Sequence, residues 1–155
     1  MTKRSVAETC RAHIGDAAAR GGRVIAGTGP VPGRDSFVRP TLLAEVTDDM
    51  LIAREETFGP VAAVLPFDDE VEVVRRANDT EMGLAASLYT DDLRRTLRIT
   101  EALEYGMVGV NTASLTGPPV PFGGWKQAGL GREGSRHGLT ESMELKYVCF
   151  GDIAA

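Results

Sequence analysis

Two adjacent carboxylates stand in the stretch EETFGP, where Glu55 and Glu56 precede Phe58 and an apolar run. An unpaired charge is costly to bury, so such acids usually stay in contact with water. On residue types alone, two solvated acids beside a core phenylalanine are the more frequent arrangement. The other interpretation is that a carboxylate and an aromatic ring two residues apart hold a ligand at a strand entrance, and it depends on the motifs around them.

The chain has two cysteines, Cys10 and Cys149, and neither stands in a setting that favours a reactive thiolate. Cys10 falls on the apolar stripe of an expected helix, and Cys149 falls inside an expected final strand. Neither has a pattern of cationic neighbours or a loop for an oxyanion, and buried cysteine is usually inert. The two residues match no metal spacing and no disulfide framework. The sequence therefore assigns no catalytic residue and no metal ligand.

Neither histidine belongs to a pattern typical of a catalytic base. His13 falls on an expected helix, and His137 follows a glycine-rich loop. No nucleophile and carboxylate accompany either residue in a recognisable arrangement. Both histidines are therefore expected at the surface.

Helices and strands alternate along most of the chain. A stripe of Val6, Cys10, Ile14 and Ala17 predicts the first helix, which should end at Gly21. The expected helices are 5–20, 68–80 and 91–106, and the expected strands are 23–27, 37–46, 61–67, 84–90, 107–111 and 142–150. This order is typical of an α/β fold with an open, doubly wound, mostly parallel sheet.

A glycine-rich loop over residues 112–133 follows the strand that ends at Asn111. In doubly wound sheets, ligands bind beyond the carboxyl ends of the strands. Glycine lets the backbone of such a loop approach a ligand closely. Asn111 can bond to the loop or merely cap a turn, and the second role is the simpler one.

Composition excludes several function classes. The chain has 155 residues, which suit one domain, with 43% hydrophobic and 25% charged residues. A net charge of −5 argues against electrostatic binding to nucleic acid. No apolar run approaches the roughly 20 residues that a membrane span requires, and the first residues contain no apolar signal core. We expect a cytoplasmic protein with no nucleic-acid or membrane partner.

Several motifs together carry a family resemblance. They are EETFGPV, ANDTEMGLAASLYT, EALEYGMVGVNT, PFGGWKQAGLGREGS and the terminal ELKYVCFG. With these motifs in this order, the chain resembles the C-terminal part of the NAD(P)-dependent aldehyde dehydrogenase family, and the succinate-semialdehyde dehydrogenases are the most similar group within it. The resemblance implies a partial catalytic domain over residues 1–141 and an oligomerisation strand with a tail over residues 142–155.

The resemblance gives the EETFGP stretch a role in cofactor binding. It implies that Glu56 holds the ribose hydroxyls next to the nicotinamide and that Phe58 packs near the nicotinamide ring. A carboxylate offers two acceptor oxygens, which suit a vicinal diol. An aromatic ring restricts the nicotinamide, and hydride transfer needs that ring held in place. The cofactor of the complete enzyme would be NAD or NADP, and the isolated chain should bind neither tightly.

The resemblance also implies a lining for an aldehyde pocket. The region of Asn111 helps form this pocket in the family, and Phe122 matches an aromatic residue of the substrate funnel. A hydroxyl residue after the asparagine contacts the distal carboxylate in succinate-semialdehyde dehydrogenases. By spacing this residue is Thr116, with Ser114 as the near alternative, although the stretch TASLTGPPV departs from the usual pattern. Lys126, Arg132 and Glu133 are expected to fix the loop.

Finally, the resemblance implies that the catalytic cysteine, the water-activating glutamate and the dinucleotide-binding domain lie upstream of this segment. We therefore expect the isolated chain to be inactive and to self-associate through the strand over residues 142–150. Two alternatives to an enzyme fragment stay open. The chain is a non-catalytic interaction or oligomerisation module, or it is one half of a split enzyme whose other polypeptide supplies the cysteine.

Overall fold

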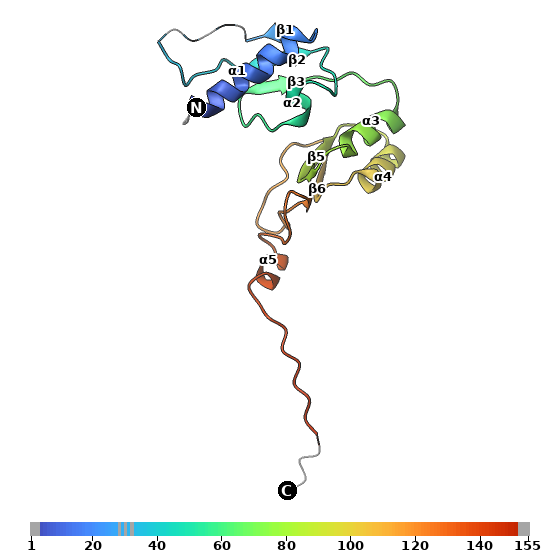
Figure 1. The fold of residues 1–155 in the computed structure, drawn as a ribbon. Helices are drawn as coiled ribbons and strands as arrows, with labels where there is room; N and C mark the ends of the chain where they lie inside the picture. The colour runs from blue at the N-terminus through green and yellow to red at the C-terminus, as the bar shows by residue number, and fades with distance from the viewer. Residues whose placement is uncertain (1–3, 28, 30, 32, 152–155) are drawn as a thin grey trace. The chain divides into compact units, whose positions relative to one another are not determined.

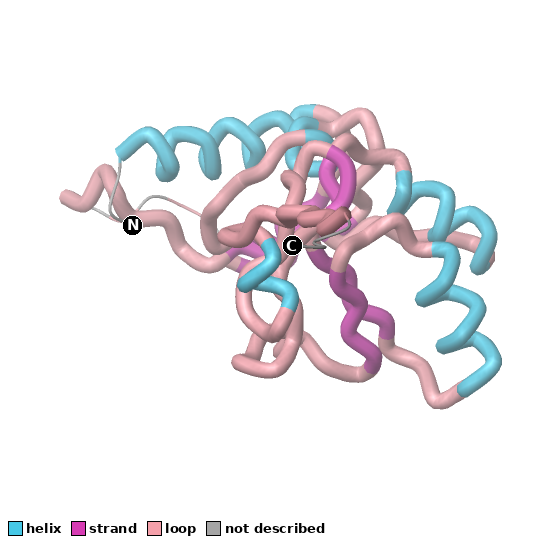
Figure 2. The backbone as a smooth tube through the Cα atoms, turned by 90° about the horizontal axis from the view of Figure 1, so that it is seen from below, coloured by secondary structure: helices cyan, strands magenta, loops and turns pink. Residues whose placement is uncertain are grey.

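The computed structural model describes residues 4–27, 29, 31 and 33–151 of the chain. The chain divides into two compact units, Met1–Asp69 and Glu70–Ala155, which are called unit 1 and unit 2. Both units combine helices with small open sheets, as Figure 1 and Figure 2 show. The mixed α/β class predicted from the sequence is therefore confirmed.

Unit 1 packs one long helix against a three-stranded sheet (Figure 1). Its elements are α1 (Arg4–Ala19), β1 (Arg23–Ala26), β2 (Thr41–Ala44), α2 (Leu51–Arg54) and β3 (Val61–Ala63). The strand order is β1-β2-β3, with β1 antiparallel and β3 parallel to β2. Leu43, Val46 and Met50 are buried at the centre of the core against Ala17 of α1.

The buried face of α1 differs slightly from the predicted stripe. Ala7, Cys10, His13 and Ala17 are buried, whereas Val6 and Ile14 are only partly so. The helix stops as predicted, because Gly21 adopts a φ of 96° and the Gly22 amide donates to the Ala17 carbonyl at 2.7 Å.

Asp16 joins α1 to the start of α2. Its carboxylate accepts from the Leu51 amide at 2.8 Å and from Arg20 at 2.7 Å. The hydrogen bond from the Leu51 backbone, and then the one from Arg20, lower the pKa of Asp16 below its ordinary value. α1 therefore fixes the point at which the chain enters α2 and the EETFGP segment.

Unit 2 contains two short sheets and a pair of helices. Its elements are α3 (Glu70–Asn78), β4 (Met82–Gly83), β5 (Ala85–Leu88), α4 (Leu93–Ala102), β6 (Met107–Val110), β7 (Trp125–Lys126) and α5 (His137–Thr140). β5 and β6 are parallel, and β4 and β7 are antiparallel. Helices α3 and α4 lie side by side next to the β5–β6 pair (Figure 1 and Figure 2). Asp92 caps α4 by accepting from the Arg94 and Arg95 amides.

Polar side chains join the ends of α3 and α4. The Asn78 amide donates to the Ala102 carbonyl at 2.8 Å and accepts from the Glu104 amide at 2.9 Å. The Tyr105 hydroxyl donates to the Ala77 carbonyl at 2.6 Å. These three hydrogen bonds tie the end of α4 and the residues between α4 and β6 to the end of α3.

The sheet arrangement differs from the predicted one. Instead of a single doubly wound sheet, the described strands form three small sheets, one of three strands and two of two strands. Apolar patterning reports which residues are buried, but it does not report which strands pair. Within the described residues, no helix is both long and apolar enough to span a bilayer.

The segment predicted as a final strand also differs. Among the described residues, 143–150 form no strand, and Leu145 and Tyr147 are almost fully exposed. A strand is stable only beside a partner, and the alternation of residue types cannot show where the partner lies. Figure 1 shows this stretch leading away from α5.

The ion pairs between α3 and α4 predict a pH dependence of stability. Glu70 bonds to Arg98 and Arg95, which in that order lower its pKa from 4.5 to about 2. A carboxyl group whose pKa is lowered by folding stabilises the folded state at pH values above its ordinary pKa. This stabilisation is lost as the pH falls from 4.5 towards 2. We expect E70Q to lower the melting temperature at neutral pH, with the difference from wild type vanishing in acid.

Thermal unfolding followed by circular dichroism across this pH range measures the effect. E101Q, which neutralises an exposed carboxylate on α4, is the matched control. An E70Q difference that is equally large in acid and at neutral pH would contradict the assignment.

Candidate functional site

The EETFGP segment is attached to α1 by a buried histidine. The His13 side chain is 1% exposed, which corrects its predicted place at the surface. Its Nδ1 lies 2.9 Å from the Thr57 Oγ1, and its Nε2 lies 3.2 Å from the Glu55 carboxylate. Both ring nitrogens therefore contact the same short segment, and these two contacts are called the His13 brace.

The other two side chains of the segment point into solvent. Glu56 is exposed, and within the described residues no hydrogen bond or ion pair to its carboxylate is found. Phe58 is 81% exposed and has a φ of 50°, which a bulky residue rarely adopts. A large apolar side chain held in water in a strained conformation is the kind of feature that marks a binding surface. Both predicted cofactor residues, which Thr57 separates in the chain, are therefore exposed.

Asn111 makes a two-point contact at the end of the parallel β5–β6 pair. Its side-chain oxygen accepts from the Thr90 amide at 2.8 Å, and its side-chain nitrogen donates to the Thr90 carbonyl at 2.9 Å. The residue has a φ of 55°. Asn111 therefore extends the strand pairing and turns the chain into the glycine-rich loop, while one N–H and one oxygen lone pair stay available.

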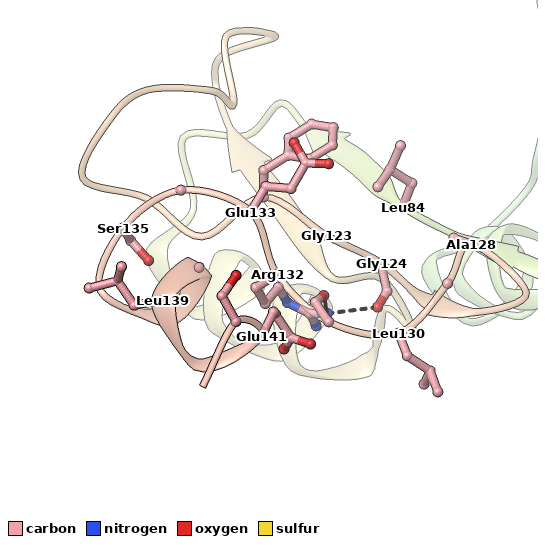
Figure 3. A pocket seen from close by; sticks show the side chains of 16 residues that line it. Leu84, Gly123, Gly124, Ala128, Leu130, Arg132, Glu133, Ser135, Leu139 and Glu141 are labelled. Atoms are coloured by element: carbon pink, nitrogen blue, oxygen red, sulfur yellow. Dashed lines mark hydrogen bonds between the residues drawn. The ribbon is translucent and has the colours of Figure 1, made fainter. Parts of the chain in front are cut away.

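The three loop residues predicted to line an aldehyde pocket have different surroundings in unit 2. Ser114 and Thr116 are exposed. Phe122 is partly buried and pairs with Glu133 through two backbone hydrogen bonds of 2.8 and 2.7 Å. Phe122 also lines a hollow of about 720 Å³ among the loop glycines, and neither Ser114 nor Thr116 lies among the lining residues (Figure 3).

Charged side chains fix the glycine-rich loop, as the sequence predicts. Arg132 donates to the Gly124 carbonyl at 3.0 Å, the bond drawn in Figure 3, and to the Gly131 carbonyl at 2.7 Å. Lys126 donates to the Asn78 carbonyl at 2.8 Å and pairs with Glu104 at 2.6 Å. Both cations are occupied with loop and helix ends, so a structural role is confirmed for them.

A glycine contact brings the loop against the start of β6. A Cβ at Gly106 would collide with the Gly123 carbonyl and would lie 2.7 Å from the Gly124 Cα. Only glycine allows the two backbone segments to approach so closely. The sequence signal for this contact was the glycine that follows helix α4.

Cys10 lies on the buried stripe of α1 as the sequence predicts, whereas Cys149 does not lie in the predicted strand. Cys10 is fully buried on α1, and burial raises the pKa of its thiol, which disfavours the thiolate. Cys149 is exposed in the segment after α5. In the part of the chain that the structure describes, no group of three or more His, Cys, Asp or Glu side chains could hold a metal ion.

The family model described as the aldehyde dehydrogenase family matches residues 1–148. The chain belongs to this family. It is 54% identical over 141 residues to a 3-sulfolactaldehyde dehydrogenase from Pseudomonas putida. It is 50% identical over 141 residues to a probable succinate-semialdehyde dehydrogenase [NADP(+)] from Sinorhizobium fredii. Each alignment covers 91% of this chain and 29% of the relative.

A solved structure agrees with this assignment. The NAD+ complex of an aldehyde dehydrogenase from Bacillus cereus is 38% identical and superposes with a TM-score of 0.88, over 94% of this chain and 30% of that one. The predicted family is thereby confirmed, and relatives include enzymes named for NAD+ and for NADP+. The chain spans less than a third of the length of these relatives.

Sequence patterning missed His13. Its partners lie 44 and 42 residues later, so no local pattern contains the contact. The available signal was its place three residues after Cys10 and four before Ala17, which is the spacing of a buried helix face.

The Asn111 contact predicts a stability series. N111G removes both hydrogen bonds to Thr90 but keeps a backbone that tolerates positive φ, and we expect a loss of about 1–2 kcal/mol. N111A adds the strain of a Cβ in this conformation, and we expect about 1 kcal/mol more. Urea unfolding of the two variants measures the free energy lost with the hydrogen bonds and the free energy lost to strain. S114A is the control in the adjacent loop. Equal stability of N111A and N111G would contradict the strain at this position.

Proposed function

We propose that this chain forms the C-terminal part of an NAD(P)-dependent aldehyde dehydrogenase that oxidises a semialdehyde, with succinic semialdehyde as the first candidate, to a carboxylic acid. The observation that carries the proposal is the exposed pair Glu56 and Phe58 on a segment held by α1. Family membership supplies the reaction class. Over residues 1–141 the chain would complete a catalytic domain, and residues 142–155 would add a strand to another subunit.

The chemistry of the segment fits the nicotinamide end of the cofactor. The Glu56 carboxylate offers two acceptor oxygens to the ribose hydroxyls, and the exposed Phe58 ring offers an apolar surface to the nicotinamide. When bound, the cofactor supplies a hydride acceptor. This chain's contribution is to orient that acceptor, because hydride transfer requires a defined position of the ring.

The substrate assignment rests on the loop after β6. Both named relatives act on aldehydes whose names indicate a second, acidic group. The exposed hydroxyls of Ser114 and Thr116 offer donors to such a group, and Asn111 and Phe122 would line the approach to it. Because those two relatives differ in their aldehydes, the loop stretch TASLTGPPV is where the choice of substrate would be made.

A second candidate function is that of an interaction module, alone or as one half of a split enzyme. The segment 143–150 favours it, because Leu145, Tyr147 and Phe150 expose apolar surface on an unpaired stretch. Sedimentation of the 155-residue chain and of a chain cut after residue 142 tests whether this segment carries association, and the activity of a chimeric enzyme that contains the chain separates an enzyme part from a module. A module would lose its association with the cut, whether or not any activity exists.

The first prediction on function concerns the 155-residue chain by itself. We expect no oxidation of succinic semialdehyde with NAD+ or NADP+, because Cys10 is buried and the sequence around the exposed Cys149 has no pattern that favours a thiolate. A chimera that carries this chain in place of the matched segment of the Sinorhizobium fredii relative should be active. The readout is NADPH or NADH absorbance. Turnover by the isolated chain, abolished by C149S, would contradict the proposal.

The second prediction concerns Glu56 in that chimera. Loss of a charged hydrogen-bond acceptor for the ribose should raise the KM for the cofactor in E56Q by about tenfold, with the aldehyde KM unchanged. E8Q removes a similarly exposed carboxylate on α1 and is the matched control. Equal cofactor KM values for E56Q, E8Q and wild type would remove Glu56 from the cofactor site.

A further inference from the structure

We propose that His13 is a positioning residue for the nicotinamide ribose site, acting through the His13 brace on Glu56 and Phe58. The inference rests on the proposed function of those two residues. It assigns a functional task to a buried helix residue that touches neither cofactor nor substrate. Its basis is the geometry of one imidazole with two partners that flank Glu56.

The hydrogen bonds fix which nitrogen carries a proton. An ionised carboxylate only accepts, so His13 Nε2 must carry the hydrogen that it directs at Glu55. The Thr57 hydroxyl then donates to a neutral Nδ1, or accepts from Nδ1–H when the ring is charged. In either state both nitrogens are satisfied by the segment, and no described buried side-chain polar atom lacks a partner.

The brace determines which way the neighbouring side chains face. Glu55 has extended backbone angles, φ −115° and ψ 144°, and side chains alternate in direction along an extended chain. Because Glu55 and Thr57 turn towards α1, the intervening Glu56 turns away from it. Glu56 is therefore presented outward by contacts made on the opposite side of the segment, whereas Phe58, at a φ of 50°, does not follow this alternation.

The conformation of Phe58 needs such a restraint. A φ of 50° costs a residue with a Cβ roughly 1–2 kcal/mol, and an exposed ring provides little packing to offset this. Thr57, the preceding residue, is held by His13, and the start of α2 is held by Asp16. His13 and Asp16 are three residues apart on α1, so one face of the helix restrains the chain at Leu51 and again at Glu55 and Thr57.

Simple packing does not account for this arrangement. A leucine of similar size would fill the same buried site on α1 and would need no polar partners. The two ring nitrogens instead meet two polar side chains on a single segment, two residues apart. Both contacts therefore act on the direction of Glu56, the residue that lies between the two partners.

The test uses the active chimera and separates positioning from packing. H13L keeps the volume of the buried side chain and removes both hydrogen bonds, and we expect the cofactor KM to rise about tenfold with the aldehyde KM unchanged. H13Q keeps one donor and one acceptor, so its cofactor KM should lie between those of H13L and wild type. C10A cuts away side-chain volume on the same buried face and should lower the melting temperature without moving the cofactor KM.

The outcomes distinguish this inference from the proposed function. If E56Q raises the cofactor KM and H13L does not, the positioning role is overturned while the function stands. If E56Q has no effect, the proposed cofactor site itself fails. If H13L does not fold, the double variant E55A/T57V removes both hydrogen-bonding partners from the other side and leaves α1 intact. An unchanged cofactor KM in that variant also overturns the inference.

A spectroscopic measurement on the 155-residue chain needs no activity. A positive φ at Phe58 brings its own amide and α protons close together, which gives a strong cross-peak between them in nuclear Overhauser spectra. We expect this signal in wild type and in C10A, and its loss in H13L and in E55A/T57V. Persistence of the signal in both brace variants would show that Phe58 is held by something else.

Discussion

The contact of one buried imidazole with two side chains of a neighbouring segment is the constraint on which the candidate cofactor site depends. It joins helix α1 to a stretch that otherwise has only a four-residue helix before it and a three-residue strand after it. Such short elements cannot fix the direction of a side chain by themselves. The helix can, because the same buried face is packed on the core through Ala17 and its end is closed by Gly21 and Gly22.

Unit 2 uses the same strategy with different groups. The amide of Asn111 continues the parallel ladder beyond the last backbone pair, and the chain then enters the glycine-rich loop at a defined angle. Lys126 and Arg132 bind backbone carbonyls instead of facing a ligand. In both units, the residues proposed to touch cofactor or substrate are exposed, apart from the partly buried Phe122. The residues that orient them are tied to helix or strand ends.

The sequence predicted the local elements better than their assembly. The helices α3 and α4 lie within the predicted ranges and α1 begins one residue before its predicted range, because apolar spacing and caps such as Asp92 act within a few residues. The pairing of strands and the burial of His13 depend on partners far away in the chain, which patterning does not contain. The motifs around Glu56 and Phe58 were sufficient to predict the family. The exposure of these two side chains and the positive φ of Phe58 could be seen only in the structure.

The most direct test of the account is a crystal structure of the chimeric enzyme with NADP+ bound. The account predicts that the Glu56 carboxylate lies within hydrogen-bonding distance of the nicotinamide ribose hydroxyls, with the Phe58 ring against the nicotinamide and the His13 contacts unchanged. A bound cofactor whose ribose is held by other side chains, with Glu56 still directed into solvent, would contradict it.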